Sequence, residues 1–165
     1  MRLLTDAMLG TLTTHLRFAG HDTAYTLEEG VDADSAVLEL ADREARRLVT
    51  RDRDLAARAP ESYLLTEHDV EAQLAELVAQ GLDHPVPAEP TRCGSCNGRL
   101  ERVPEGEPTP DYAPTAVSGD GSTGQKVGPD DPASGGFRVW RCVDCGQHFW
   151  KGSHWETMRE RLAEL

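Results

Sequence analysis

The stretch "LVTRDRDLA", residues 48–56, decides the fold that the sequence predicts. Its first three residues are Leu, Val and Thr, which favour a short buried strand. Asp52 and Asp54 follow directly, each preceded by an arginine, and "DRDLAARA" continues as a short helix that ends before Pro60. A strand that runs through two carboxylates into a helix is typical of one repeat of an α/β sheet.

The same order of strand and helix recurs through the first half of the chain. The expected strands are "RLLT" (2–5), "HDTAYTL" (21–27), "RRLVT" (46–50) and "SYLLT" (62–66), and the longer helices lie within 7–20, 32–45 and 69–81. Strands that alternate with helices need crossover connections, which make the sheet mainly parallel and place helices on both faces. The sequence therefore predicts an α/β fold with three α/β/α layers.

All four cysteines fall in two C-x-x-C pairs, the spacing of a tetrahedral zinc site: Cys93, Cys96, Cys142 and Cys145. Two disulfides or a redox pair are the alternatives, but short β-like runs flank both pairs and the chain looks cytosolic, which favours zinc. Four thiolates leave no open coordination position, so the Zn²⁺ is expected to be structural. The sequence predicts a small four-cysteine zinc ribbon.

Proline and glycine divide the chain into two expected domains. "LDHPVPAEPT" (82–91) contains three prolines and is typical of a linker. We expect an α/β domain at 1–90 and, at 91–165, the ribbon followed by a C-terminal helix near 155–165. Residues 104–136 are rich in Gly, Pro, Ser, Thr and Asp, which predicts a long flexible loop inside the ribbon.

Charge and hydropathy set limits on partners and location. No apolar run approaches the ~20 residues of a membrane span, and the first residues do not resemble a signal peptide, so we expect a soluble, cytoplasmic protein. The net charge of −12 taken alone argues against a nucleic-acid ligand. The two segments 92–103 and 137–155, however, carry six basic and only two acidic side chains. The chain is acidic with one basic region around the cysteines.

Several carboxylates are expected at one edge of the sheet. Asp6 and Asp52 each come after a predicted strand, which places both at the carboxyl edge, where parallel sheets bind ligands. Asp34 and Asp54 can join them. Oxygen ligands of this kind suit Mg²⁺ or Mn²⁺, and metal-dependent phosphodiester hydrolysis is the chemistry that such a site supports. Each Asp taken singly is more often the N-cap of the following helix.

Four motifs in order along nearly the whole chain resemble one family. They are "LLTDAMLGTLTTHLRFAGHDTAY", "VTRDRDLA", the split four-cysteine pair and "FWKGSHWETMRERL", and together they are similar to the Mut-seven C-terminal RNase family. The resemblance implies a PIN-like ribonuclease fold joined to a zinc ribbon, with acids that bind divalent metal. Its acids correspond to Asp6, Asp52 and Asp54, and the acid before the second helix to Asp34, although Asp32 lies close by.

The residues and the resemblance together predict a metal-dependent endoribonuclease that acts on RNA. Five basic residues are candidates to hold substrate phosphates: Arg51, Arg53, Arg138, Arg141 and Lys151. For Arg51 and Arg53, a role as solvated charges that compensate nearby acids is an equally good interpretation. The tryptophans around the ribbon are either platforms on which bases stack or part of the core. The alternatives are a non-catalytic RNA- or protein-binding adaptor and a DNA nuclease; the oligomeric state stays open.

Overall fold

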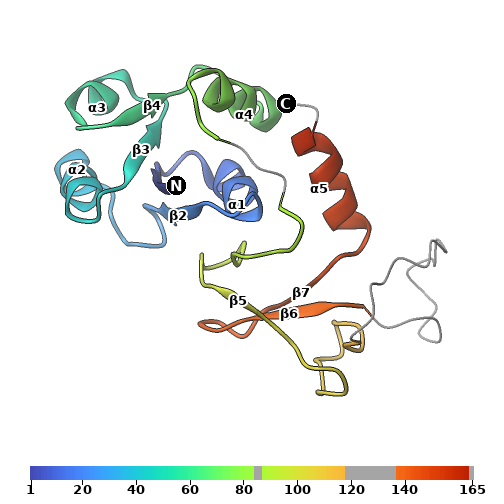
Figure 1. The fold of residues 1–165 in the computed structure, drawn as a ribbon. Coiled ribbons are helices and arrows are strands. Elements are labelled where there is room, and N and C mark those ends of the chain that lie inside the picture. Colours follow the sequence, from blue (N-terminus) through green and yellow to red (C-terminus); the bar gives the residue numbers. More distant parts are fainter. Residues whose placement is uncertain (84–86, 118–136, 164–165) are drawn as a thin grey trace.

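The computed structural model describes residues 1–83, 87–117 and 137–163. A four-stranded sheet forms its N-terminal part (Figure 1). The strands are β1 (Arg2–Thr5), β2 (Asp22–Tyr25), β3 (Arg47–Thr50) and β4 (Ser62–Leu64), in the spatial order β2-β1-β3-β4, and every pair is parallel. The expected mainly parallel sheet is confirmed.

Helices cover both faces of this sheet. They are α1 (Gly10–Phe18), α2 (Asp34–Arg43), α3 (Arg53–Arg58) and α4 (Val70–Ala79). Side chains of successive strand residues point to opposite faces. Leu3 and Val49 accordingly pack with leucines of α1 and α4, whereas Leu4 and Leu48 pack with α2 and α3. The two apolar clusters establish the three α/β/α layers that the sequence predicts.

The order of the strands creates a switch point between β1 and β3. The chain leaves β1 for β2 on one side and then crosses back to β3 on the other side of β1. Open parallel sheets bind ligands at the carboxyl ends of the strands that flank such a reversal. Asp6 follows β1, and Arg51 and Asp52 follow β3. The fold therefore brings the ends of these two strands, and the acids that follow them, to adjacent positions.

A second, antiparallel sheet carries the cysteines. Its strands β5 (Leu100–Arg102), β6 (Val139–Cys142) and β7 (His148–Trp150) lie in that order, and α5 (Ser153–Ala163) follows. The chain then turns back toward α1 and α4 (Figure 1). Trp155 packs on Phe18 with ring centroids 4.4 Å apart, and Arg161 Nε lies 3.4 Å from Glu71 Oε1. None of the described helices is long and apolar enough to cross a membrane.

The expected flexible loop is only partly among the described residues, since 118–136 lie outside them. Its beginning packs on the ribbon: Ala116 pairs with Phe137 and is buried with Val103 and Val139. The apolar residues of this Gly- and Pro-rich segment are isolated and have no periodicity. The sequence of the segment therefore did not indicate that Ala116 packs on the ribbon. Part of the expected linker, 84–86, also lies outside the described residues.

A buried arginine joins the first cysteine pair to the parallel sheet. Arg17 of α1 is 1% exposed. Its guanidinium donates to the carbonyl oxygens of Thr23 (2.9 Å) and Gly94 (3.0 Å) and forms two bonds with Glu28, 2.6 and 3.1 Å long. Buried polar groups must be hydrogen-bonded, and the planar guanidinium satisfies several at once. Arg17 therefore ties α1, β2 and the segment between Cys93 and Cys96 together.

Asn97 makes the second connection between the cysteines and the sheet. Its backbone is left-handed, with φ of 65°, and its side-chain Oδ1 accepts from the Thr23 amide at 3.0 Å while Nδ2 donates to Asp22 Oδ1 at 2.7 Å. Burial alone would raise the pKa of Asp22, but hydrogen bonds from Arg46 and Asn97 and the charge of Arg92 hold that pKa below its usual value. The Asp22 carboxylate is thus a charged acceptor shared by both parts of the chain.

Replacing Arg17 by Met is expected to lower the free energy of unfolding by about 3 kcal/mol, because the buried Thr23 carbonyl and the half-buried Gly94 carbonyl lose their donor. Chemical denaturation of the zinc-loaded chain measures this change. Arg43→Met is the control, since Arg43 is exposed and, among the described residues, forms an ion pair only with its neighbour Glu44, at 3.7 Å. Equal stability of the two variants would mean that the buried connection contributes nothing.

Candidate functional site

Hydrogen bonds of its amide and its carboxylate hold Asp6 at the carboxyl end of β1. Its amide donates to the Val49 carbonyl at 3.0 Å, which extends the pairing of β1 with β3 by one residue. Its carboxylate accepts from the Ala7 amide at 2.6 Å and from the Thr50 hydroxyl at 2.7 Å. The side chain is half-buried, so it is oriented by the protein and still reaches solvent.

The Thr50 hydroxyl links Asp6 to Asp52. It donates to Asp6 Oδ2 and accepts from the Asp52 amide at 3.0 Å. Asp52 Oδ1 in turn accepts from the amides of Asp54 and Leu55, at 2.8 and 2.9 Å, and so caps α3. The capping alternative is therefore realised at Asp52, but only one carboxylate oxygen takes part; Oδ2 accepts no hydrogen bond from a described residue.

The other two candidate acids are placed differently. Asp34 is the first residue of α2 and its Oδ2 accepts from Arg58 Nη1 at 3.0 Å, in an exposed ion pair between α2 and α3. Asp54 lies in the first turn of α3 and is exposed, as is Asp32 before α2. Within the described residues, no three acids approach one another closely enough to share an ion. The structure brings Asp6 and Asp52 to one edge and does not gather all four.

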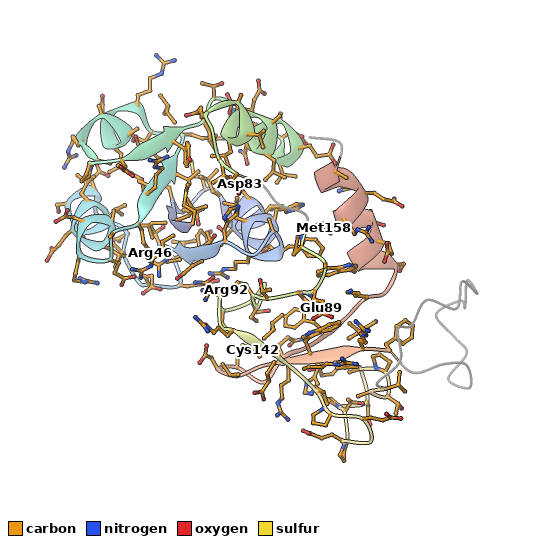
Figure 2. All side chains as sticks on the ribbon, in the orientation of Figure 1. Arg46, Asp83, Glu89, Arg92, Cys142 and Met158 are labelled. Carbon is orange, nitrogen blue, oxygen red and sulfur yellow. The ribbon has the colours of Figure 1, made fainter. Side chains whose placement is uncertain are left out.

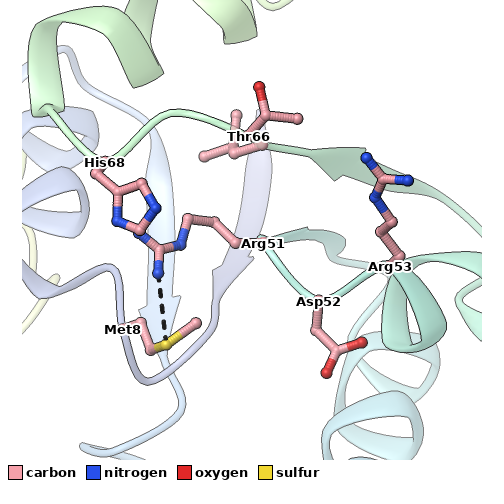
Figure 3. Close-up of a pocket in the computed structure, with 7 residues that line it drawn as sticks. Met8, Arg51, Asp52, Arg53, Thr66 and His68 are labelled. Carbon is pink, nitrogen blue, oxygen red and sulfur yellow. Dashed lines mark hydrogen bonds between the residues drawn. The ribbon is translucent and has the colours of Figure 1, made fainter.

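A cleft of about 400 Å³ opens beside this edge (Figure 3). The residues that line it are Met8, Arg51, Asp52, Arg53, Leu65, Thr66 and His68. Figure 3 shows Arg51 reaching toward Met8 and His68, while the Asp52 carboxylate points away from them. Arg51 Nη1 lies 2.6 Å from His68 Nδ1 and Nη2 lies 3.8 Å from Met8 Sδ.

The cleft contains two arginines that were predicted as site residues and two further polar residues that were not. Arg51 and Arg53 form no ion pair with a carboxylate in the part of the chain that the structure describes, and both readings of these two arginines stay predictions. Thr66 and His68 come just after β4, at the same sheet edge as the acids. That position was the available signal, since neither residue belongs to a motif.

The basic candidates of the ribbon are already engaged with other side chains. Arg138 Nη1 lies 3.0 Å from Glu89 Oε1, and Arg141 donates to Glu101 at 2.8 Å and to Glu107 at 2.6 Å. The ammonium of Lys151 lies 5.7 and 5.9 Å from the ring centroids of Trp140 and Trp155. Both tryptophans are buried, at 3% and 6% exposed, which supports the core reading for these two.

The four cysteines meet at one point. Their sulfurs all lie within 4.8 Å of one another, and Cys93 and Cys145 are 3.7 Å apart and Cys96 and Cys142 3.5 Å apart. A tetrahedron of sulfurs about 2.3 Å from a zinc ion has edges of about 3.8 Å. All four thiols are free. The donor set and its spacing therefore fit a structural zinc site.

The thiols of the site differ in how readily they ionise. Burial raises the pKa of the Cys93 and Cys96 thiols above the usual value. Burial opposes the ionisation of Cys142 as well, but hydrogen bonds from the amides of Cys145 and Asp144 to its sulfur bring that pKa below the usual value. A bound zinc needs four thiolates, so it must displace protons from the first pair.

Gly98 leaves the space that the cysteine site needs. A Cβ at this position would lie 2.6 Å from Cys142 Sγ and would collide with the Asp144 carboxylate. Gly98→Ala is therefore expected to lower zinc affinity by about tenfold or more, because a ligand sulfur must shift. Competition with a chromogenic chelator measures this affinity. Gly94→Ala is the control, since its Cβ would meet only Thr14 Cγ2 at 3.4 Å; equal affinities would contradict the argument.

The fold and the two sites define a class of protein: an α/β domain with acids at the switch point of its sheet, joined to a ribbon of zinc-binding geometry. Comparison with family models shows which family of that class the chain belongs to. The model of the Mut7-C RNAse domain matches residues 1–162, and the chain belongs to this family. The resemblance expected from the sequence is confirmed. No curated protein and no solved structure matches the chain.

Proposed function

We propose that the protein is a divalent-metal-dependent endoribonuclease whose centre is the edge between β1 and β3. The observation that carries the proposal is the pair Asp6 and Asp52, linked through the Thr50 hydroxyl at the switch point of the sheet in a member of an RNase domain family. Asp6 and Asp52 are the proposed metal ligands, and Asp34 and Asp54 are outer acids that complete the negative field.

The donors at this edge fit Mg²⁺ or Mn²⁺. Magnesium is usually held by one or two carboxylates together with water and substrate phosphate, so a protein cage of three acids is not required. Asp52 Oδ2 is free of hydrogen bonds from described residues, and the orientation of the Asp6 carboxylate is fixed by Thr50 and Ala7. When bound, the metal would polarise the scissile phosphate and lower the pKa of a bound water.

The chain's own residues would orient the RNA. Arg51 and Arg53 flank Asp52 in the sequence and line the cleft, so their guanidinium groups are the first candidates to hold phosphate oxygens beside the acids. His68 lies against Arg51 and limits where that guanidinium can swing. Arg138 and Arg141 would first have to leave their glutamates, and Lys151 its tryptophans, before they contact a phosphate.

We further propose that the chain has two domains, a nuclease domain at 1–90 and a second domain at 91–165 that consists of the ribbon and the C-terminal helix. The ribbon would use its structural zinc to stay folded and would help to hold the substrate. Arg17 and Asn97 support a fixed placement of the ribbon on the sheet, because they bond to both parts.

Cleavage of a labelled single-stranded RNA by the zinc-loaded chain tests the proposal. We expect cutting inside the strand with added Mn²⁺ or Mg²⁺, none without them, and much less with a DNA strand of the same sequence. Preferential cutting of DNA would replace the ribonuclease by a DNA nuclease. If neither strand is cut, the non-catalytic adaptor is favoured. The acids would then have structural roles only, Asp52 as the cap of α3 and Asp34 in its ion pair with Arg58.

A further inference from the structure

A second cavity, of about 340 Å³, lies between α1, β7 and α5, away from the acidic edge. Four aromatic side chains line it, Phe18, Phe149, Trp150 and Trp155, together with Met158 of α5. Figure 2 shows Met158 between α1 and α5, and Arg92 between α1 and the ribbon. The cavity is partly open to solvent, so a ligand can enter it.

Polar residues complete the lining of this cavity. They are Thr14 of α1, Arg92, Gln147 and Ser153 of α5. The cavity thus combines aromatic faces with groups that can donate or accept hydrogen bonds.

We propose that this cavity binds an unpaired nucleobase of single-stranded RNA, which rests on the proposed ribonuclease function. A base stacks on aromatic rings and offers neutral donors and acceptors at its edge, which the side-chain amide of Gln147 can meet. The volume falls in the range of about 300–1,000 Å³ that small ligands occupy.

The charge of the chain supports a base rather than a phosphate as the anchor. The net charge of −12 and screening by salt both weaken the phosphate contacts proposed for Arg51 and Arg53. Stacking is independent of that charge. A base held here would compensate for the repulsion between an acidic protein and a polyanion.

The cavity is also placed to serve the acidic edge. Phe18 is the last residue of α1, and Gly10, its first, lies shortly after Asp6. A helix of this length measures about 12 Å, at about 1.5 Å per residue. A short run of nucleotides can therefore join a base in the cavity to a phosphate at the acids, so the cavity would position the strand along α1.

Tryptophan fluorescence tests the proposal on the unaltered, zinc-loaded chain without Mg²⁺ or Mn²⁺, because Trp150 and Trp155 line the cavity. We expect a short single-stranded RNA to quench the emission at low and at molar salt, and a ribose-phosphate strand of equal length without bases to leave it unchanged. Equal quenching by both strands, or by neither, would overturn the proposal.

A matched pair of variants locates the base. Phe149→Leu removes a ring from the cavity and is expected to weaken RNA binding by about tenfold. Phe137→Leu makes the same change on the ribbon outside the cavity and is expected to alter binding by less than about twofold. Equal effects of the two substitutions would overturn the assignment.

The outcomes separate this proposal from the nuclease. If the chain shows base-dependent quenching but never cleaves RNA, the cavity binds a base and the proposed catalytic function is wrong. If Phe149→Leu cleaves RNA normally and the parent chain shows no base-dependent quenching, the nuclease proposal stands and the proposal of a base-binding cavity is wrong.

Discussion

Replacing Asp6 or Asp52 by Asn is expected to lower metal-dependent RNA cleavage by about a thousandfold. A metal that polarises a phosphate contributes several kcal/mol to transition-state stabilisation, and each 1.36 kcal/mol is about tenfold in rate. Asn keeps the shape of the side chain and is itself a good N-cap, so Asp52→Asn preserves the start of α3. Single-turnover cleavage of labelled RNA in Mn²⁺ measures the effect.

The control for this pair is Asp42→Asn, which removes one negative charge from an exposed position on α2 and touches no candidate ligand. It is expected to cleave at the parental rate. If Asp6→Asn and Asp52→Asn also cleave normally while their melting temperatures are unchanged, the two acids serve only the fold. Thr50→Val extends the test, because it removes the hydroxyl between them and is expected to impair cleavage less than either Asn variant.

Cys142→Ser is expected to abolish stoichiometric zinc binding and to unfold the ribbon. Binding of a structural zinc supplies about 10 kcal/mol or more of apparent free energy, which three thiolates and a hydroxyl cannot replace. Cys142 is buried at the end of β6, so its loss also disturbs the pairing with β5. Metal analysis and thermal denaturation measure the two effects.

Ser95→Ala is the matched control, since Ser95 lies in the first C-x-x-C pair and is exposed. It is expected to retain one zinc per chain and the parental melting temperature. Full stability of Cys142→Ser without metal would show that the ribbon folds on its apolar contacts alone, around Val103, Ala116 and Val139. The zinc would then be dispensable for the fold.

The sequence predicted the fold well because the signals were local. Short apolar strands that end in Asp, and apolar positions at helical spacing, determine the layers without knowledge of distant contacts. Helix limits were less accurate: the first helix begins at Gly10, because residues after Asp6 first form a turn in which the Leu9 amide donates to the Asp6 carbonyl. The meeting of the four cysteines was predictable from their spacing.

The details of the acidic edge depend on contacts that no local pattern reveals. The link through Thr50 requires the register of β1 against β3, and the pairing of Asp34 with Arg58 requires the packing of α2 on α3. Arg17 had the sequence context of an ordinary helix arginine, yet it is buried because Glu28 and two carbonyl groups converge on it. Such contacts follow from tertiary structure.

The bond between Asn97 and β2 has a consequence for the newly made chain. β2 is an outer strand of the parallel sheet, and an uncovered outer strand is a template for pairing with another molecule and thus for aggregation. The strands of the sheet leave the ribosome well before Asn97, and Cys142 and Cys145 follow much later. Until the second cysteine pair emerges, nothing in the zinc site fixes Asn97 against Thr23. The supply of zinc at the end of synthesis therefore bears on solubility, and zinc-starved cells are expected to accumulate this protein in aggregates.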